Sequence, residues 1–181
     1  MQQSCVILLL FYTIYFVNGY GYSSNGLYCS SFKSKIYQVS ITFPDLDPFY
    51  AIFDFQDNYK VVEYDNIGHG GSKAELGVDL TLDTHVGYYA CHGREFVHAS
   101  IAGWIYKTAG VPALEDNGAL AVHNYKLYFS RDRETCTGSM EYSFYKTGSD
   151  PFARKNKPTL HTEGGVVTCK LLKYRSPEHY S

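Results

Sequence analysis

Apolar and polar residues alternate along most of the chain, with the period of two that is typical of strands rather than the period of a helix. The longest such stretch runs from Val86 to Tyr145, where turn signals at 92–94, 116–118 and 131–134 separate successive alternating runs. Each run suits a strand with one buried and one exposed face. This stretch therefore predicts four antiparallel strands in a meander.

Shorter alternating runs predict further strands at residues 37–43, 49–55, 59–64, 78–86 and 166–174. Residues 68–73 and 147–165 are rich in glycine, serine or proline and are predicted as loops. About eight strands joined in sequence by short links favour an all-β, up-and-down antiparallel barrel, because closure removes exposed sheet edges. A β-sandwich is the alternative architecture.

The ends of the chain differ from this pattern. An apolar run from Cys5 to Val17, followed by small residues up to Gly19, is typical of a signal peptide and is too short to span a bilayer. We therefore expect a signal peptide at 1–19, an irregular leader at 20–35, one β-barrel domain at 36–174 and a tail at 175–181. The protein is expected to be secreted.

Cleavage after residue 19 would remove Cys5 and leave Cys29, Cys91, Cys136 and Cys169. An even number of cysteines in a secreted chain predicts two disulfides, and the sequence leaves their pairing open. The wide spacing between these residues fits no zinc-finger pattern.

The chain has a formal net charge of −2, with 16 basic and 18 acidic residues. A nucleic-acid-binding protein needs a basic surface that displaces counterions from phosphates. The charge balance therefore disfavours nucleic acid as a partner.

Asp79, Asp83 and His85 fall on one face of the strand predicted at 78–86, opposite the apolar face. Such a face is most simply a solvated outer surface, although two carboxylates and an imidazole can also act as an acid-base pair or hold a cation. If the face pointed into the barrel, the buried carboxylates would need a partner.

Three histidines of the meander, His92, His98 and His123, are expected to be individually satisfied, with His123 opposite Tyr142. The sequence contains neither a nucleophile elbow nor a His-Glu-x-x-His pair. We accordingly predict no enzyme activity, no catalytic residue, no metal and no cofactor.

Tyrosine and phenylalanine are unusually frequent, with eighteen and eleven residues, against one tryptophan. Tyrosine has an apolar ring and a polar tip and suits both a packed core and a ligand pocket. The residues that could line an interior cavity are Trp104, Tyr125, Phe129, Tyr142 and Phe144. Tyrosines near the two ends of the chain could instead serve cross-linking or adhesion.

Several short motifs together resemble the small secreted lipocalin-like barrels of the calycin type. They are Gly87-Tyr88-Tyr89, Gly93-Arg94-Glu95-Phe96, Asp116-Asn117-Gly118, Tyr125, Thr137-Gly138 and Phe144. The resemblance covers residues 76–174. It implies a closed barrel, and it carries over no functional residue.

Two functions follow from these observations. The first is a secreted, non-catalytic barrel that binds a small apolar molecule in its interior. The second is a structural component of an extracellular matrix, such as an invertebrate shell or cuticle, with matrix components as partners.

Overall fold

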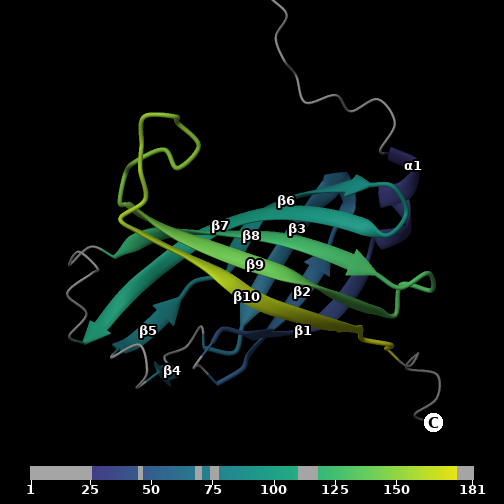
Figure 1. The fold of residues 1–181 in the computed structure, drawn as a ribbon, viewed down its shortest axis with the longest axis horizontal. Coiled ribbons are helices and arrows are strands. Elements are labelled where there is room, and N and C mark those ends of the chain that lie inside the picture. The colour runs from purple at the N-terminus through teal and green to yellow at the C-terminus, as the bar shows by residue number, and fades with distance from the viewer. Residues whose placement is uncertain (1–25, 45–46, 68–70, 74–77, 110–117, 175–181) are drawn as a thin grey trace, which may run out of the picture.

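The computed structural model describes residues 26–44, 47–67, 71–73, 78–109 and 118–174. The predicted signal peptide and tail lie outside these ranges. The described chain forms a closed antiparallel barrel of eight strands, which confirms the all-β, up-and-down prediction (Figure 1). The barrel strands are β1 (Lys35–Thr42), β2 (Phe49–Phe55), β3 (Lys60–Asp65), β6 (His85–His92), β7 (Phe96–Ala109), β8 (Ala119–Phe129), β9 (Thr135–Lys146) and β10 (Leu160–Leu171).

Each barrel strand pairs with the barrel strand that precedes it, and β1 closes the ring by pairing with β10. Two short strands, β4 (Gly71–Lys73) and β5 (Val78–Leu82), extend the sheet beyond the barrel along β7. The prediction of a loop at 68–73 is wrong for the residues of β4, which pair with β5. Likewise, β10 begins inside the loop predicted at 147–165.

The strand predicted at 78–86 is interrupted at Asp83 and Thr84, between β5 and β6. Both strands pair with β7, and Leu82 is opposite Ile105 while Val86 is opposite Ala102. The register is therefore offset by one residue across the interruption, and one residue of offset exchanges the two faces of a strand.

The larger part of the core fills one end of the barrel with aromatic rings. Phe55 contacts the rings of Phe32, Tyr37, Phe53, Tyr89 and Phe129 with centroids 4.9–6.3 Å apart. Four of these five ring pairs are edge-on, and such pairs stabilise a core beyond the area they bury. A smaller apolar cluster at the opposite end comprises Leu82, Ile105, Ala119, Ala121 and Phe144.

The described part of the segment before β1, predicted as an irregular leader at 20–35, contains the short helical turn α1 (Gly26–Cys29), followed by the 3-10 turn η1 (Ser30–Phe32). These turns lie at the aromatic end of the barrel (Figure 1). Phe32 is fully buried there, and the Arg133 guanidinium lies 4.5 Å from the centre of its ring. The Arg133 side chain also donates a hydrogen bond to Ser31 Oγ. Phe32 thus closes this end of the barrel.

Two disulfides join the four predicted cysteines, Cys29 with Cys91 and Cys136 with Cys169. The first ties α1 to β6, and the second links the neighbouring strands β9 and β10. No helix among the described residues has the length and apolar character that a membrane span requires.

Candidate functional site

Four ionisable side chains meet inside the barrel, between the aromatic end and the smaller apolar cluster. They are Glu63, Asp65, His85 and His123, and each side chain is 6% exposed or less. Burial of so many ionisable groups costs free energy unless they are paired or neutralised. A cluster of this kind therefore marks a site.

Three of the four residues come from one strand pair. Glu63 and Asp65 are two positions apart on β3, so both side chains point inward, and His85 on β6 is directly opposite Glu63. The one-residue offset after Leu82 turns His85 inward and leaves Val86 57% exposed. The prediction that His85 lies on a solvated outer face is therefore wrong.

Asp83 is exposed, as that prediction expected. The structure describes the backbone of Asp79 but not its side chain. Asp79, Asp83 and His85 consequently do not form one polar face.

The fourth residue, His123, reaches the cluster from β8, on the far side of β7. It is opposite Tyr142, as predicted. The intervening strand carries Gly103 at the inward position, and a Cβ there would lie 2.7 Å from Cγ of His85. The absence of a side chain at Gly103 thus makes room for the imidazole of His85.

Hydrogen bonds hold one half of the cluster in place. Oε2 of Glu63 lies 2.9 Å from Nδ1 of His123, and the Tyr125 hydroxyl donates to Oε1 of the same carboxyl group at 2.6 Å. The rings of His85 and His123 stack at 4.3 Å with an interplanar angle of 16°. The prediction of an individually satisfied histidine is therefore wrong for His123, which contacts both Glu63 and His85, while His92 and His98 are exposed and lie outside the cluster.

The other half of the cluster lacks such partners. Neither oxygen of Asp65 and neither ring nitrogen of His85 makes a hydrogen bond of normal geometry with a described residue, although the carboxyl groups of Glu63 and Asp65 are close enough to affect each other's pKa. Their closest mutual approach, from His85 Nδ1 to Asp65 Oδ2, is 3.8 Å, which is too long for a hydrogen bond. Because native proteins rarely leave buried polar atoms unpaired, these four atoms indicate a missing ligand such as an ion or a water molecule.

Burial shifts the pKa values of all four groups toward their neutral forms. It raises the pKa of Glu63 to about 7, and burial together with the charge of Glu63 raises the pKa of Asp65 to about 8. Burial lowers the pKa of His123 to about 4, and burial together with the charge of His123 lowers the pKa of His85 to about 3. Neutral imidazoles with free lone pairs are metal ligands, and the carboxyl groups become ligands once they lose a proton.

The ligand atoms of Glu63, His85 and His123 all lie within 4.8 Å of one another. Such a group has the residue types and proximity of a divalent metal site. Sequence reasoning missed Glu63 and Asp65 entirely. The sequence did contain a signal for Glu63. This residue lies two positions after Val61 on β3, so its side chain points inward at a position where an apolar residue is expected.

The five side chains predicted to line a ligand cavity do not meet around one space. Tyr125 belongs to the polar cluster, Phe129 to the aromatic end, and Phe144 to the smaller apolar cluster with Tyr142 packed against it. Trp104 alternates with the inward-facing Gly103 and Ile105 and is on the outer face of β7. Its outward position follows from the strand phase.

A second cluster with metal-ligating residue types, Glu141, His161 and Glu163, is on the outer surface of β9 and β10. The two ring nitrogens of His161 already lie within hydrogen-bond distance of Ser143 and Glu163, at 2.8 and 2.9 Å. The Glu163 side chain is 72% exposed. Exposed acidic side chains with satisfied neighbours are ordinary surface features, and this cluster is the weaker candidate.

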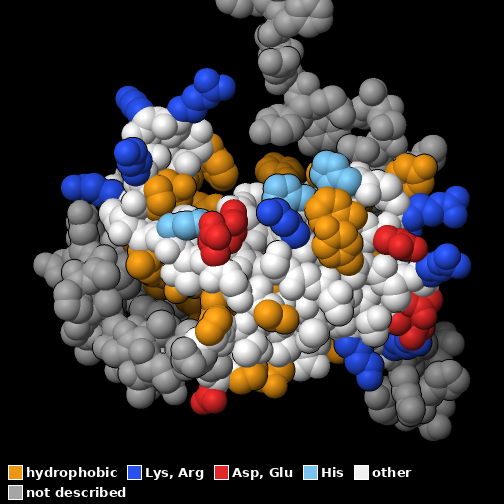
Figure 2. Space-filling model, viewed as in Figure 1, with side chains coloured by type: hydrophobic (Ala, Val, Ile, Leu, Met, Phe, Trp, Pro, Cys, Tyr) orange, Lys and Arg blue, Asp and Glu red, His pale blue; other side chains and the backbone are white. Residues whose placement is uncertain are grey.

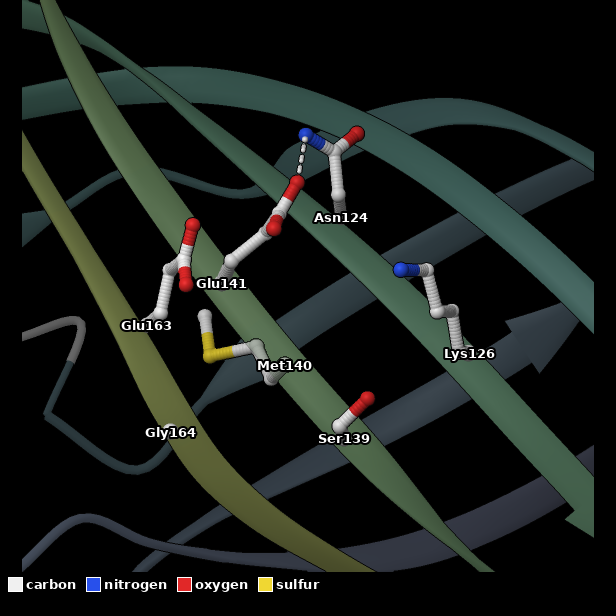
Figure 3. A pocket seen from close by; sticks show the side chains of 7 residues that line it. All are labelled: Asn124, Lys126, Ser139, Met140, Glu141, Glu163 and Gly164. Atoms are coloured by element: carbon white, nitrogen blue, oxygen red, sulfur yellow. Dashed lines mark hydrogen bonds between the residues drawn. The ribbon is translucent and has the colours of Figure 1, made fainter.

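Beside this cluster is a hollow of about 170 Å³, lined by Asn124, Lys126, Ser139, Met140, Glu141, Glu163 and Gly164. Figure 3 shows Glu141 and Glu163 next to each other, Lys126 on the neighbouring strand, and the 3.3 Å hydrogen bond that Asn124 donates to Glu141. The lining is largely polar and lies outside the barrel, so it does not match the predicted apolar cavity. On the face in Figure 2, side chains of both charge signs are interspersed.

Neither a protein-family model nor a curated protein nor a solved structure matches this chain. The function is therefore inferred from the site itself.

Proposed function

We propose that the protein is a non-catalytic, secreted β-barrel that binds one divalent metal ion in its interior. The proposal rests on the four unpaired polar atoms of Asp65 and His85, which lie beside the Glu63–His123 pair. A cation among these side chains would satisfy the atoms that make no hydrogen bond of normal geometry with a described residue. It would also favour the ionised carboxylates that burial alone disfavours.

The interior supports a cation better than the apolar molecule expected from the sequence. The aromatic rings at one end contact one another, Tyr125 contacts Phe53 with centroids 4.9 Å apart, and the interior between the two apolar clusters carries ionisable groups. An apolar ligand placed there would leave those groups unpaired. The roles of apolar carrier and matrix component stay predictions.

Thermal unfolding of the chelator-treated protein tests the proposal. A divalent ion at about 100 times its Kd should stabilise the native state by about 2.7 kcal/mol, which corresponds to roughly 5–10 °C in Tm. Metal analysis after dialysis should give one ion per chain. The variant His161→Ala should bind equally well, because it alters only the surface cluster.

The substitution Glu63→Gln preserves the shape of the side chain and removes its charge, so it should abolish stoichiometric binding. Stoichiometric binding that survives in folded Glu63→Gln, or that disappears in His161→Ala, would contradict the proposed site. A Tm that responds to no divalent ion would contradict the proposed function.

A further inference from the structure

The donor atoms of the buried cluster differ from those that calcium and magnesium select. Building on the proposed function, we infer that the ion is zinc-class, a d-block cation bound by Glu63, Asp65, His85 and His123 with no coordination position left for a substrate. The inference names the kind of ion, assigns Asp65 as the fourth ligand, and gives Tyr125 the role of a positioning residue.

The mixture of two imidazoles and two carboxylates favours this class of ion. Calcium takes six to eight oxygen ligands, commonly including backbone carbonyls, and magnesium keeps several waters in an octahedral shell. Imidazole nitrogen instead suits zinc, copper, iron and nickel. Two histidines among four candidate ligands therefore direct the site toward zinc-class ions.

The spacing of the two histidine–carboxylate pairs fits a four-coordinate ion. In a tetrahedral shell with metal–ligand distances of about 2.1 Å, neighbouring ligand atoms lie about 3.4 Å apart. The two pairs bracket this value, with 2.9 Å between Glu63 Oε2 and His123 Nδ1 and 3.8 Å between Asp65 Oδ2 and His85 Nδ1. The ligand atoms of Glu63, His85 and His123 already lie within 4.8 Å of one another, and binding would require rotation of the Asp65 side chain to bring its carboxylate to the same ion.

Asp65 completes the set because its side chain is fully buried and neither of its oxygens makes a hydrogen bond of normal geometry with a described residue. With Glu63 and the two histidines, it would supply four protein ligands to one ion. Zinc sites in which the protein supplies all four ligands are structural, whereas catalytic sites keep one position for water. The inferred coordination therefore agrees with a non-catalytic barrel.

Tyr125 is placed to orient the ligand carboxylate without touching the ion. Its hydroxyl donates to Oε1 of Glu63 at 2.6 Å and leaves Oε2 directed at His123. Hydrogen bonds of this outer kind fix the orientation of metal ligands, and their loss lowers metal affinity by roughly 10- to 100-fold. Tyr37 is a matched control, because it is equally buried and its hydroxyl donates to the backbone oxygen of Arg133 instead.

Cobalt(II) substitution tests the inference, because its visible absorption distinguishes tetrahedral from octahedral coordination. We expect one Co²⁺ per chain with the intense bands of a tetrahedral site, displaced by one equivalent of Zn²⁺ and unaffected by excess Ca²⁺ or Mg²⁺. X-ray absorption of the zinc-loaded wild-type protein should count two imidazole ligands, a measurement that needs no variant.

The possible failures are distinguishable. If no divalent ion binds, both the proposed function and this inference are wrong. If Ca²⁺ or Mg²⁺ competes, or the cobalt spectrum is octahedral, the proposed function stands and the zinc-class inference is overturned.

Variants separate the roles of the individual residues. Tyr125→Phe should lower Zn²⁺ affinity roughly 10- to 100-fold and shift the cobalt bands, while Tyr37→Phe should change neither. Asp65→Asn should change the cobalt spectrum and weaken Zn²⁺ binding, because an amide replaces a charged ligand. An unchanged spectrum in folded Asp65→Asn would remove Asp65 from the ligand set, and equal effects of the two tyrosine substitutions would remove the positioning role of Tyr125.

Discussion

The imidazoles of His85 and His123 stack at 4.3 Å although they belong to strands that do not pair, because β7 lies between β6 and β8. The contact depends on Gly103, the inward residue of β7 next to His85. The polar centre of the barrel is thus assembled over a position without a side chain.

Gly103→Ala should expose this dependence. The added Cβ would lie 2.7 Å from the His85 ring, and overpacking of this kind costs about 1–3 kcal/mol of unfolding free energy. The substitution should also weaken metal binding, because the ring must move. Urea unfolding and metal titration measure the two effects.

The double variant Gly103→Ala/His85→Ala provides the control. Since the clash involves the ring, the cost of Gly103→Ala should fall in the His85→Ala background, with a coupling of about 1–3 kcal/mol in a double-mutant cycle. If the losses of unfolding free energy in the two single variants simply add in the double variant, Gly103 acts through the backbone instead of through the His85 ring.

The stability of the metal-free protein should have an unusual pH dependence. The pKa values of Glu63 and Asp65 are raised from 4.5 and 3.8 to about 7 and 8, so their contribution is present at low pH and is lost as the pH rises. The pKa values of His85 and His123 are lowered from 6.5 to about 3 and 4, so their contribution is lost as the pH falls.

The contributions of the carboxyl groups and of the histidines oppose each other between pH 4.5 and 6.5, so we expect the unfolding free energy to stay nearly constant over this range. From pH 6.5 to 8, only the carboxyl groups act, and the unfolding free energy should fall by roughly 2–3 kcal/mol. Chemical unfolding across this range is the measurement. In the variant Glu63→Gln/Asp65→Asn this loss should disappear, and a wild-type-like decline would assign it to other groups.

The disulfide between Cys29 and Cys91 should contribute strongly to stability. It closes a loop with a sequence separation of 62, and loop-closure entropy gives about 4 kcal/mol for that length. Replacing both cysteines by alanine should lower the unfolding free energy by that order. The Cys136–Cys169 pair, with a separation of 33, should contribute slightly less by the same reasoning.

Phe32→Ala tests the closure of the aromatic end. Removal of a fully buried phenylalanine typically costs about 3–5 kcal/mol, and here it would also release the contact with Arg133. Phe152→Ala is the control, because its side chain is exposed and should change stability by less than about 0.5 kcal/mol. Equal Tm values for the two variants would contradict the closing role of Phe32.

The fold was predictable because alternation is a local property that each strand carries in its own sequence. Pairing of successive strands then follows from short connections, and the order from β6 to β9 matches the meander predicted between Val86 and Tyr145. The site was much less predictable. Its residues come from three separate strands, and their meeting depends on barrel closure and on the register offset before His85.

Local signals for the site existed but were ambiguous. Glu63 follows Val61 in the inward phase of β3, and His123 occupies the inward phase of β8 between Ala121 and Tyr125. A charged or polar residue at a strand position where the alternation calls for an apolar one indicates either the end of the strand or a buried polar site. Only the three-dimensional arrangement distinguishes these two cases. Trp104 illustrates the converse, since its apolar ring occupies an outward position.

The irregularity at Asp83 and Thr84 has an evolutionary consequence. With unbroken alternation after Leu82, Val86 would take the inward place on β6, and His85 would face solvent. Loss of the one-residue register offset in this segment, with the chain length unchanged, would thus exchange the two residues and convert a polar centre into an ordinary apolar wall. The same step in reverse is a short route by which a plain barrel acquires a buried histidine.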